Sequence, residues 1–379
     1  MPNLLMLNKY QKIPKNISPQ LDSIRGLSAL IVLFAHANQV FIAPISMQYS
    51  GIAGLFAQAA VMIFFVLSGF LIGKSLTRNM NKNGSLNLSE YLIDRFNRIY
   101  PPLIFSILLV VVLYFLAPFF FTSNSNFFYF SNNLNLARPG FIIDLNSVFS
   151  SLFLINGFLG PTISSNPPLW SLSYEVWYYL LAGLAFKFNK KYNIILFFII
   201  TIILGYLSKG FIIFSLVWFS GLILCLIHNN NLKIDKFISF FKTISLFSLF
   251  VFAYIYLTKF HPLPKLKFFS PDLAMLLFRL SVGFYTTLFL YEILNNKLKF
   301  ITFFRSSSKY SYTLYIIHFP IFLFSYGVFE NLIKENISYS LFLSLLLSLF
   351  VIFLSKIIAS KLENIKILDN SKKKFESKK

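Results

Sequence analysis

Long apolar runs recur along the chain and restrict its fold more than any other feature of the sequence. Many of them reach about 18 residues or more, which is enough for a helix to span a bilayer. Only 12% of the residues are charged and 56% are hydrophobic, whereas a soluble domain would carry about twice that charge. We therefore predict an all-α polytopic membrane protein. The ten predicted spans cover roughly residues 23–42, 55–76, 93–121, 169–187, 193–208, 211–228, 242–258, 273–294, 309–329 and 338–360.

The positions of the lysines and arginines predict how these spans are oriented. If the N-terminus is cytoplasmic, nearly all cations fall in inner segments. The outer segments then carry only Arg138, Lys209, Lys259, Lys265, Lys267 and Lys334. Cytoplasmic loops are enriched in lysine and arginine, so we predict that both termini are cytoplasmic. The N-terminus lacks a signal-peptide cleavage pattern, and the first span is expected to act as an uncleaved anchor.

The formal net charge of +21 does not indicate a nucleic-acid partner. The cations lie in short loops and tails between apolar runs, where they set topology and contact anionic lipids. The single cysteine, Cys225, excludes an internal disulfide and a cysteine metal cluster. No histidine motif for a metal is present, and we predict no metal site.

We predict one transmembrane domain over residues 1–365 and a polybasic tail at 366–379 that contacts inner-leaflet lipids. The longest outer segment, 122–168, contains an apolar piece, SVFSSLFLINGFLG, that is too short to span. We expect this piece to be interfacial or re-entrant. Two interpretations stay open: the segment covers a site on the outer face, or it is an ordered but inert loop.

Two ionisable residues share one face of the first span. His36 lies eleven positions after Arg25, which brings the two residues within roughly 20° around the helix and roughly 16 Å apart along it. Ionisable groups inside a membrane are costly and usually functional. Arg25 could instead be a snorkelling residue, and His36 could bond a neighbouring helix.

A pair of arginines follows in YLIDRFNRIYPP. Arg95 and Arg98 are three residues apart and so share a helix face near the cytoplasmic side, just before Pro101 and Pro102, which bend or restart the chain. Two guanidinium groups at this spacing suit phosphate oxygens. The alternative is ordinary positive-inside charge.

Further polar residues lie within the apolar spans. Glu175 is expected in the outer third of its span, where a carboxylate needs a partner or a proton. Arg279 is a candidate to pair with Glu175 or to bind an anionic ligand. Ser68 lies in VLSGFLIG beside Gly69 and Gly73, and small residues of this kind permit close helix packing. It is a weak candidate nucleophile because no G-x-S-x-G context surrounds it.

The segment KYSYTLYIIHFP places three polar residues on one face of the ninth span. Ser311, Tyr315 and His318 follow i, i+4, i+7 spacing. His318 is expected near the middle of the membrane. Interhelical hydrogen bonding is the simpler role for these side chains.

The predicted depths of these residues separate two functions. The arginines gather at the inner side, and the groups that can exchange protons lie deeper or toward the outside. A phosphate-bearing donor held at the cytoplasmic end could meet an acceptor at or beyond the midplane. This arrangement suits transfer of a group across a membrane.

The motifs resemble the membrane-bound acyltransferase family 3, which includes bacterial O-acetyltransferases of O-antigen, peptidoglycan and other glycans. The matching pieces are Arg25 and His36 at the family's R/K-x10-H spacing, FFVLSGFLI at 64–72, RFNR at 95–98 followed by IYP, WSLSYE at 170–175 and SYTLYIIH at 311–318. They occur in the family's order and extend over nearly the whole chain.

The resemblance implies a multi-pass O-acyltransferase of the bacterial inner membrane, with cytoplasmic acetyl-CoA as donor substrate and no permanently bound cofactor. It implies that His36 is catalytic, that Arg25 supports it, and that Arg95 and Arg98 contact the phosphates of the coenzyme. It also implies an acceptor on the outer side, a surface glycan such as lipopolysaccharide or a lipid-linked saccharide. Some relatives carry an extra extracytoplasmic domain, so this chain is expected to act alone or with an acyl-relay or glycan-assembly partner.

Two routes fit these residues. His36 takes the proton of an acceptor hydroxyl that attacks the thioester, or His36 is acylated first and passes the acyl group outward. Glu175 or Arg279 would orient the imidazole or stabilise the oxyanion. The competing hypotheses are a transporter or exporter of a small anion or glycan precursor, which buried Arg, Glu and His also suit, and a scaffold subunit of a glycan-assembly complex.

Overall fold

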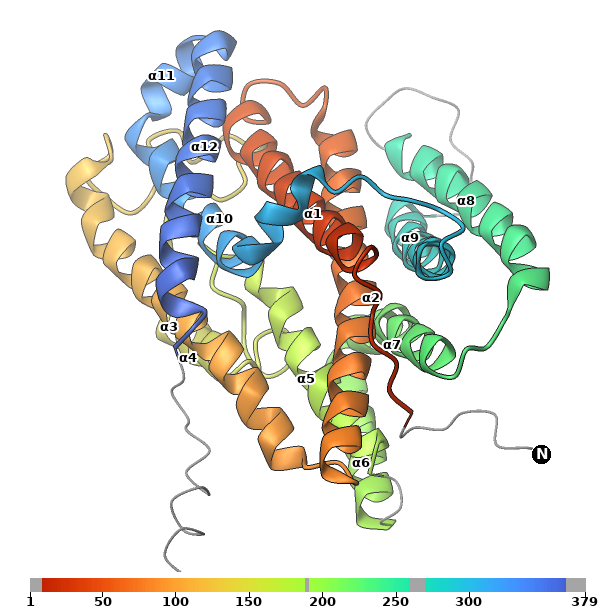
Figure 1. The fold of residues 1–379 in the computed structure, drawn as a ribbon. Coiled ribbons are helices and arrows are strands. Elements are labelled where there is room, and N and C mark those ends of the chain that lie inside the picture. Colours follow the sequence, from red (N-terminus) through yellow and green to blue (C-terminus); the bar gives the residue numbers. More distant parts are fainter. Residues whose placement is uncertain (1–8, 188–190, 259–269, 366–379) are drawn as a thin grey trace, which may run out of the picture.

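The computed structural model describes residues 9–187, 191–258 and 270–365, and within these ranges the chain is helical and has no strand. The all-α prediction is therefore confirmed, while the predicted tail at 366–379 lies outside the described residues. In chain order the elements are α1 (Ser18–Ala37), the π-helical turn η1 (Asn38–Ile42), α2 (Ser50–Asn83), α3 (Leu88–Phe120), α4 (Leu145–Leu152), α5 (Leu169–Ala185), α6 (Lys191–Leu207), α7 (Lys209–Asn229), α8 (Asp235–Leu257), α9 (Pro271–Leu294), the 3₁₀ helix η2 (Phe303–Lys309), α10 (Ser311–Val328), α11 (Glu330–Glu335) and α12 (Ile337–Leu362) (Figure 1).

Each of the ten predicted spans corresponds to one long helix. Eight of the described helices are long and apolar enough to cross a membrane: α1 with η1, α2, α3, α7, α8, α9, α10 and α12. The other two, α5 and α6, have 17 residues each, which is at the short end of the range for a transmembrane helix.

Helix α2 lies at the centre of the bundle and packs against α1, α7 and α9 (Figure 1). Small residues bring α2 and α7 into close contact. A Cβ atom at Gly69 would lie 2.0 Å from the carbonyl oxygen of Trp218, and one at Gly221 would lie 2.0 Å from that of Val66. The predicted packing role of the small residues near Ser68 is thus confirmed at Gly69.

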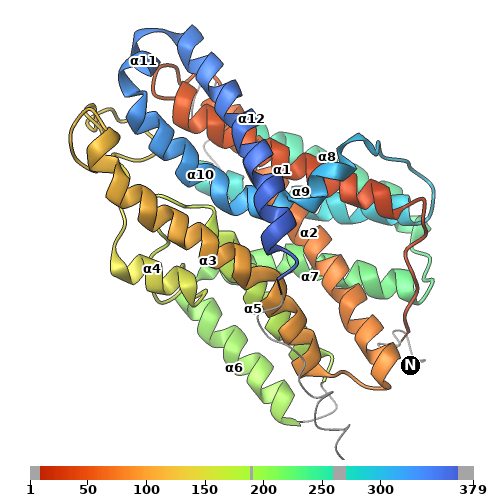
Figure 2. The ribbon, with the colours of Figure 1, turned by 60° about the vertical axis from the view of Figure 1, so that its left-hand side comes forward.

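Helix α1 is enclosed on several sides, which fixes the position of its polar face. It packs against α2, α10 and η2, and the chain between α9 and α10 crosses it (Figure 2). Directly after Ala37 the helix widens into the π-helical turn η1. Such turns inside α-helices are rare and are frequent at functional sites. Here the turn begins two residues after His36.

Helix α3 is continuous through its prolines. Asn87 caps the first turn by accepting a hydrogen bond of 3.1 Å from the backbone N–H of Glu90. Although the sequence allowed a restart at Pro101 and Pro102, the helix runs without a break from Leu88 to Phe120. The arginine pair and the apolar part of the span therefore belong to one rigid element.

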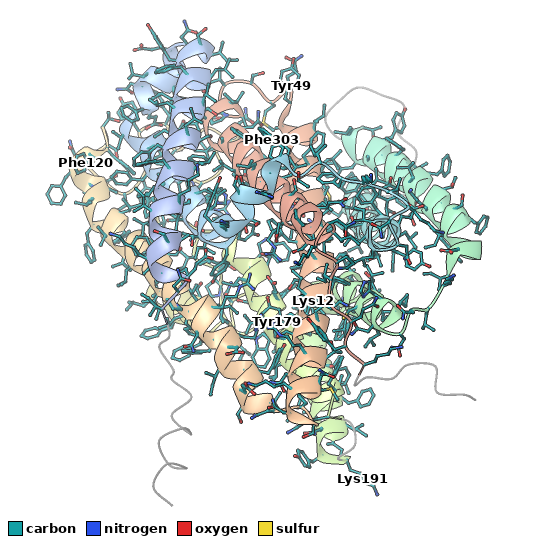
Figure 3. The ribbon with its side chains drawn as sticks, in the orientation of Figure 1. Lys12, Tyr49, Phe120, Tyr179, Lys191 and Phe303 are labelled. Carbon is teal, nitrogen blue, oxygen red and sulfur yellow. The ribbon has the colours of Figure 1, made fainter. Side chains whose placement is uncertain are left out.

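The two ends of the bundle are distinguished by their loops. Figure 3 shows Tyr49, in the connection between α1 and α2, at the opposite end of the molecule from Lys191 at the start of α6, with Tyr179 between them. The segment preceding α1 and the end of α12 both extend toward the end that carries Lys191 (Figure 1). The predicted topology requires these two segments to lie on the same side, and the lysine and arginine distribution predicts that this side is cytoplasmic.

The outer segment is packed onto the helices rather than free of them. Phe128 and Phe141 are buried in the cluster that joins the outer parts of α1, α3 and α10. The carboxylate of Glu330 accepts hydrogen bonds of 2.9 Å from the backbone N–H groups of Tyr129 and Phe130. The first six residues of the short apolar piece, 147–152, lie in α4, which has eight residues and is too short to span, as predicted.

Candidate active site

A cavity of about 110 Å³ lies among α1, α2, α3, α5 and α10. It brings together seven of the ten residues predicted from the sequence to form the site. These are Arg25, Ser68, Arg95, Arg98, Glu175, Ser311 and Tyr315. His36, His318 and Arg279 do not line it. Residues separated by up to 290 positions in the chain thus share one chamber, close to the helix ends predicted to be cytoplasmic.

Three guanidinium groups face this cavity, and none of them forms an ion pair within the described ranges. Arg98 is exposed, whereas Arg25 and Arg95 are half-buried. The Nε atom of Arg95 is buried without a hydrogen-bond partner. Buried cations and polar atoms are costly unless they are paired. The wall of the cavity is therefore suited to an anion that supplies several oxygen acceptors.

The carboxylate in the cavity is already engaged. Glu175 accepts a short hydrogen bond from the Ser68 hydroxyl and a second one, of 2.5 Å, from the Tyr179 hydroxyl. The indole N–H of Trp218 in turn donates to the Ser68 oxygen at 3.2 Å. Both hydroxyl groups donate to the same carboxylate oxygen, Oε1 of Glu175. They also tie α2, α5 and α7 together at the cavity wall.

The two membrane histidines form a pair. His36 Nδ1 lies 2.7 Å from His318 Nε2, and the two rings meet edge to edge, with centroids 5.0 Å apart and planes 11° apart. His318 is completely buried and His36 is half-buried. The edge of the Phe319 ring covers His36 at 5.3 Å. The prediction that Glu175 or Arg279 orients the His36 imidazole is therefore wrong, because the hydrogen-bond partner of the ring is His318.

Tyr315 links the pair to the cavity. It lines the cavity, and its ring centroid lies 6.2 Å from that of His318, one helical turn away. Its hydroxyl is held at 2.7 Å by the Ser171 hydroxyl, and Phe64 packs edge-on against its ring. The arginines, Tyr315 and the histidine pair thus follow one another along the bundle.

Pro320 shapes the part of α10 that carries His318. Proline has no N–H group, so the carbonyl of Ile316, four residues earlier, loses its helical partner. That carbonyl accepts hydrogen bonds instead from the Ser106 hydroxyl at 2.6 Å and from Asn166 Nδ2 at 2.8 Å. The sequence analysis did not identify Ser106 and Asn166. The signal was the proline two residues after His318, which leaves a buried carbonyl in need of donors.

Arg279 lies elsewhere in the molecule. Its guanidinium group stacks over the ring of Phe214 at 5.4 Å. Within the described part of the chain it forms no ion pair with Glu175, although the sequence allowed that pairing. The depth of a residue in its span says nothing about the direction in which its side chain leaves the helix. Arg279 leaves α9 toward α7.

The outer segment contributes Arg138, which was predicted only as an outer-side cation and not as a residue of the site. Arg138 is half-buried and donates from Nε to the carbonyl of Ser164 at 3.0 Å and from Nη1 to the carbonyl of Ala137 at 2.6 Å. Burial lowers the pKa of its guanidinium group. Arg138 lies close enough to His36 for the two side chains to interact electrostatically. That segment 122–168 covers the site stays a prediction.

Fold and site together define a multi-pass membrane protein whose interior combines an arginine-lined cavity with a hydrogen-bonded histidine pair. This chain belongs to the acyltransferase 3 family, since the family model for the acyltransferase domain matches residues 18–360. The resemblance inferred from the five motifs is thus confirmed.

Two curated relatives are similar to parts of the chain. One is the peptidoglycan O-acetyltransferase OatA of Listeria monocytogenes serovar 1/2a, 34% identical over 175 residues, which cover 46% of this chain and 25% of that protein. The other is Protein 2 in the picA locus of Rhizobium radiobacter, 31% identical over 87 residues, which cover 23% of this chain and 40% of that protein. The matches thus extend over less than half of each relative. No solved structure matches the chain.

Proposed function

We propose that this protein is an O-acetyltransferase of the bacterial inner membrane. It transfers an acetyl group from cytoplasmic acetyl-CoA to a hydroxyl of a cell-surface or exported glycan. The observation that carries the proposal is the arginine-lined cavity, which reaches the histidine pair through Tyr315.

The donor site follows from the charges of the cavity. Coenzyme A carries three phosphoryl groups, and Arg25, Arg95 and Arg98 offer guanidinium groups that have no ion-pair partner in the described structure. Guanidinium forks suit phosphate oxygens. Arg98 is exposed and marks the cytoplasmic entrance. A donor whose phosphates bind there would extend its thioester inward past Ser68 and Tyr315.

The acceptor class comes from family membership and from the relative that is named for peptidoglycan O-acetylation. A glycan hydroxyl would approach the histidine pair from the outer side, under the segment that carries Arg138. Peptidoglycan, lipopolysaccharide and other polysaccharides all carry suitable hydroxyl groups.

His36 catalyses the acetyl transfer by one of two routes, as a general base or as a nucleophile. As a general base, His36 takes the proton of the acceptor hydroxyl while the hydroxyl oxygen attacks the thioester carbonyl. The C–O bond forms, the C–S bond breaks, and the proton passes from His36 to the coenzyme sulfur. As a nucleophile, its nitrogen forms a C–N bond to the acetyl carbon while the C–S bond breaks and releases the thiolate. The acceptor hydroxyl oxygen then attacks the acetyl carbon, the C–N bond breaks, and the hydroxyl proton passes by way of the freed imidazole to the thiolate.

Purified protein in proteoliposomes, supplied with acetyl-CoA carrying a labelled acetyl group, tests this function. We expect label to appear on a surface-glycan fragment on the side opposite the donor, and a His36→Ala variant that enters the membrane normally should transfer none. Mass spectrometry of surface glycans from cells with and without the gene identifies the sugar. Movement of unmodified acetyl-CoA or glycan across the vesicle, without transfer, would instead establish a transporter.

A further inference from the structure

We infer that His318 is a positioning residue that holds the His36 imidazole in one tautomer, with the proton on Nδ1 and the free electron pair on Nε2. The inference rests on the proposed function, since it states which atom of His36 reacts. It follows from two hydrogen bonds, one between the α10 backbone and His318 and one between His318 and His36.

The chain of hydrogen bonds begins at a group that can only accept. His318 Nδ1 lies 2.9 Å from the carbonyl oxygen of Leu314, one turn earlier in the helix. A carbonyl oxygen has no proton to give, so His318 Nδ1 must be the donor. In a neutral imidazole one nitrogen carries the proton and the other accepts. His318 Nε2 is therefore the acceptor.

The second hydrogen bond determines which nitrogen of His36 carries the proton. His36 Nδ1 lies 2.7 Å from His318 Nε2. Because His318 Nε2 accepts, His36 Nδ1 must donate and carries the proton of the neutral ring. The free electron pair of His36 is then on Nε2, the nitrogen that points away from His318. Only that nitrogen can take a proton or attack a carbonyl carbon.

The surroundings favour this neutral arrangement. His318 is completely buried, and the rings of Phe319 and Phe322 pack against it at 6.5 Å and 6.0 Å between centroids. An apolar setting of this kind disfavours a permanent charge. Among the residues that the structure describes, the ionisable side chains beside the pair are Tyr315 on α10 and Arg138 from the outer segment. Neither side chain is a carboxylate that could replace His318 as the acceptor.

His318 thus occupies the place that a carboxylate takes in a serine–histidine–aspartate triad, where the third group fixes the tautomer and orientation of the imidazole. When His36 Nε2 is protonated or acylated, the ring becomes an imidazolium whose Nδ1–H still points at His318 Nε2. The bond then becomes charge-assisted and stronger than the neutral one. His318 therefore stabilises the intermediate more than the resting state.

Nitrogen NMR on full-length protein labelled with ¹⁵N-histidine in nanodiscs tests the tautomer directly. The chain has four histidines, and His36→Gln and His318→Gln variants assign the two signals. We expect His36 to be protonated on Nδ1 and unprotonated on Nε2. A proton on Nε2 of His36 would overturn the inference. This readout does not depend on catalysis, so it decides the inference even if no acetyl transfer is found and the proposed function fails.

Two amide substitutions at His318 test the positioning role. The glutamine oxygen of His318→Gln can reach the place of Nε2 and accept from His36. The shorter His318→Asn can reach only the place of Nδ1 and leaves His36 without an acceptor. We expect His318→Asn to lower kcat by about 10²-fold or more, as loss of the correct tautomer does elsewhere, while KM for acetyl-CoA stays unchanged. The kcat of His318→Gln should be at least tenfold higher than that of His318→Asn. Equal activities of the two variants, or a loss confined to KM, would refute the positioning role.

Discussion

Asn166 donates a hydrogen bond of 2.8 Å to the carbonyl oxygen of Ile316, 150 residues further along the chain. The carbonyl is available because Pro320 provides no N–H group to α10. The same amide nitrogen also bonds the Ser106 hydroxyl at 3.1 Å. The segment between α4 and α5 is thereby attached to the turn of α10 that carries His318.

Asn166→Ala is expected to loosen this turn. Loss of a neutral hydrogen bond costs about 1 kcal/mol, so the thermal midpoint in detergent should fall modestly. Acetyl transfer should fall more, by about tenfold, because the position of His318 depends on the turn. Initial rates over a range of acetyl-CoA concentrations would separate kcat from KM, and we expect the change in kcat.

Pro320→Ala provides the matched control for Asn166. Alanine at position 320 has an N–H group that can bond the Ile316 carbonyl within the helix. Adding Asn166→Ala to the Pro320→Ala variant should therefore lower kcat by a smaller factor than Asn166→Ala lowers it in the wild-type protein. Additive losses in such a double-mutant cycle would mean that Asn166 does not act through Ile316.

The arginine pair of α3 is expected to control donor affinity. Replacing both Arg95 and Arg98 by alanine removes two charges from the cavity wall. Charge-assisted hydrogen bonds contribute about 1.5–3 kcal/mol each, so KM for acetyl-CoA should rise by at least about tenfold. The apparent KM for the acceptor should change little, because the acceptor approaches from the other side. Titration of the purified variant with acetyl-CoA provides the same comparison without catalysis.

Arg279→Met is the control for this experiment. Arg279 is a half-buried arginine within a span, like Arg95, but it stacks on Phe214 and does not line the cavity. Its replacement should leave KM for acetyl-CoA unchanged. If Arg279→Met weakened acetyl-CoA binding as much as the Arg95 and Arg98 double variant does, general destabilisation would explain both results. The proposal that the pair binds the phosphates would then fail.

Helix periodicity and topology predicted much of the site. The spacing of Arg95 and Arg98 put both side chains on one face, and their place at the inner side of α3 put them beside Arg25. Both inferences need only the rise and turn of a helix and the positive-inside rule. Glu175 was predicted in the outer third of its span, whereas it lines the cavity together with the inner-side arginines. Its place in a polar network follows from the cost of an isolated charge.

The partners of these residues could not be predicted in the same way. His36 and His318 are 282 residues apart, and their contact depends on how α1 and α10 are rotated about their axes. Arg279 illustrates the converse, since its depth matches the site but its side chain leaves α9 in another direction. A buried carbonyl at Ile316 follows from Pro320 alone, whereas the donors that satisfy it come from α3 and from the segment before α5.

Glu363 is expected to make donor binding depend on pH. It follows the last residue of α12, accepts a hydrogen bond of 2.7 Å from the Thr313 hydroxyl and lies within electrostatic reach of Arg98 and Arg25. Burial raises the pKa of its carboxyl above the usual value of 4.5. As pH rises through this raised pKa, Glu363 becomes an anion beside the arginines and competes with the phosphates. KM for acetyl-CoA should therefore be lower on the acid side of this transition and higher above it.

Glu363→Gln keeps the hydrogen-bond acceptor and removes the charge. At pH values above the transition this variant should have a lower KM for acetyl-CoA than wild type, and the ratio of the two KM values should approach one at acid pH. Because the phosphate of the donor also titrates near pH 6, the ratio at each pH is the informative quantity. A ratio that does not change with pH would show that Glu363 does not face the donor.

The contact between α2 and α7 is expected to tolerate no added methyl group. In Gly69→Ala the new Cβ would lie 2.0 Å from the carbonyl oxygen of Trp218, and the backbones would have to separate. Overpacking of this kind costs about 1–3 kcal/mol or more, and it would also disturb the hydrogen bond from Trp218 to Ser68 at the cavity wall. Gly54→Ala, in the same helix, meets nothing within 4 Å and should stabilise α2 by about 0.5–1 kcal/mol through helix propensity. We therefore expect the thermal midpoint in detergent to fall for Gly69→Ala and to stay or rise for Gly54→Ala. Equal midpoints would mean that α2 and α7 are less closely packed than the structure requires.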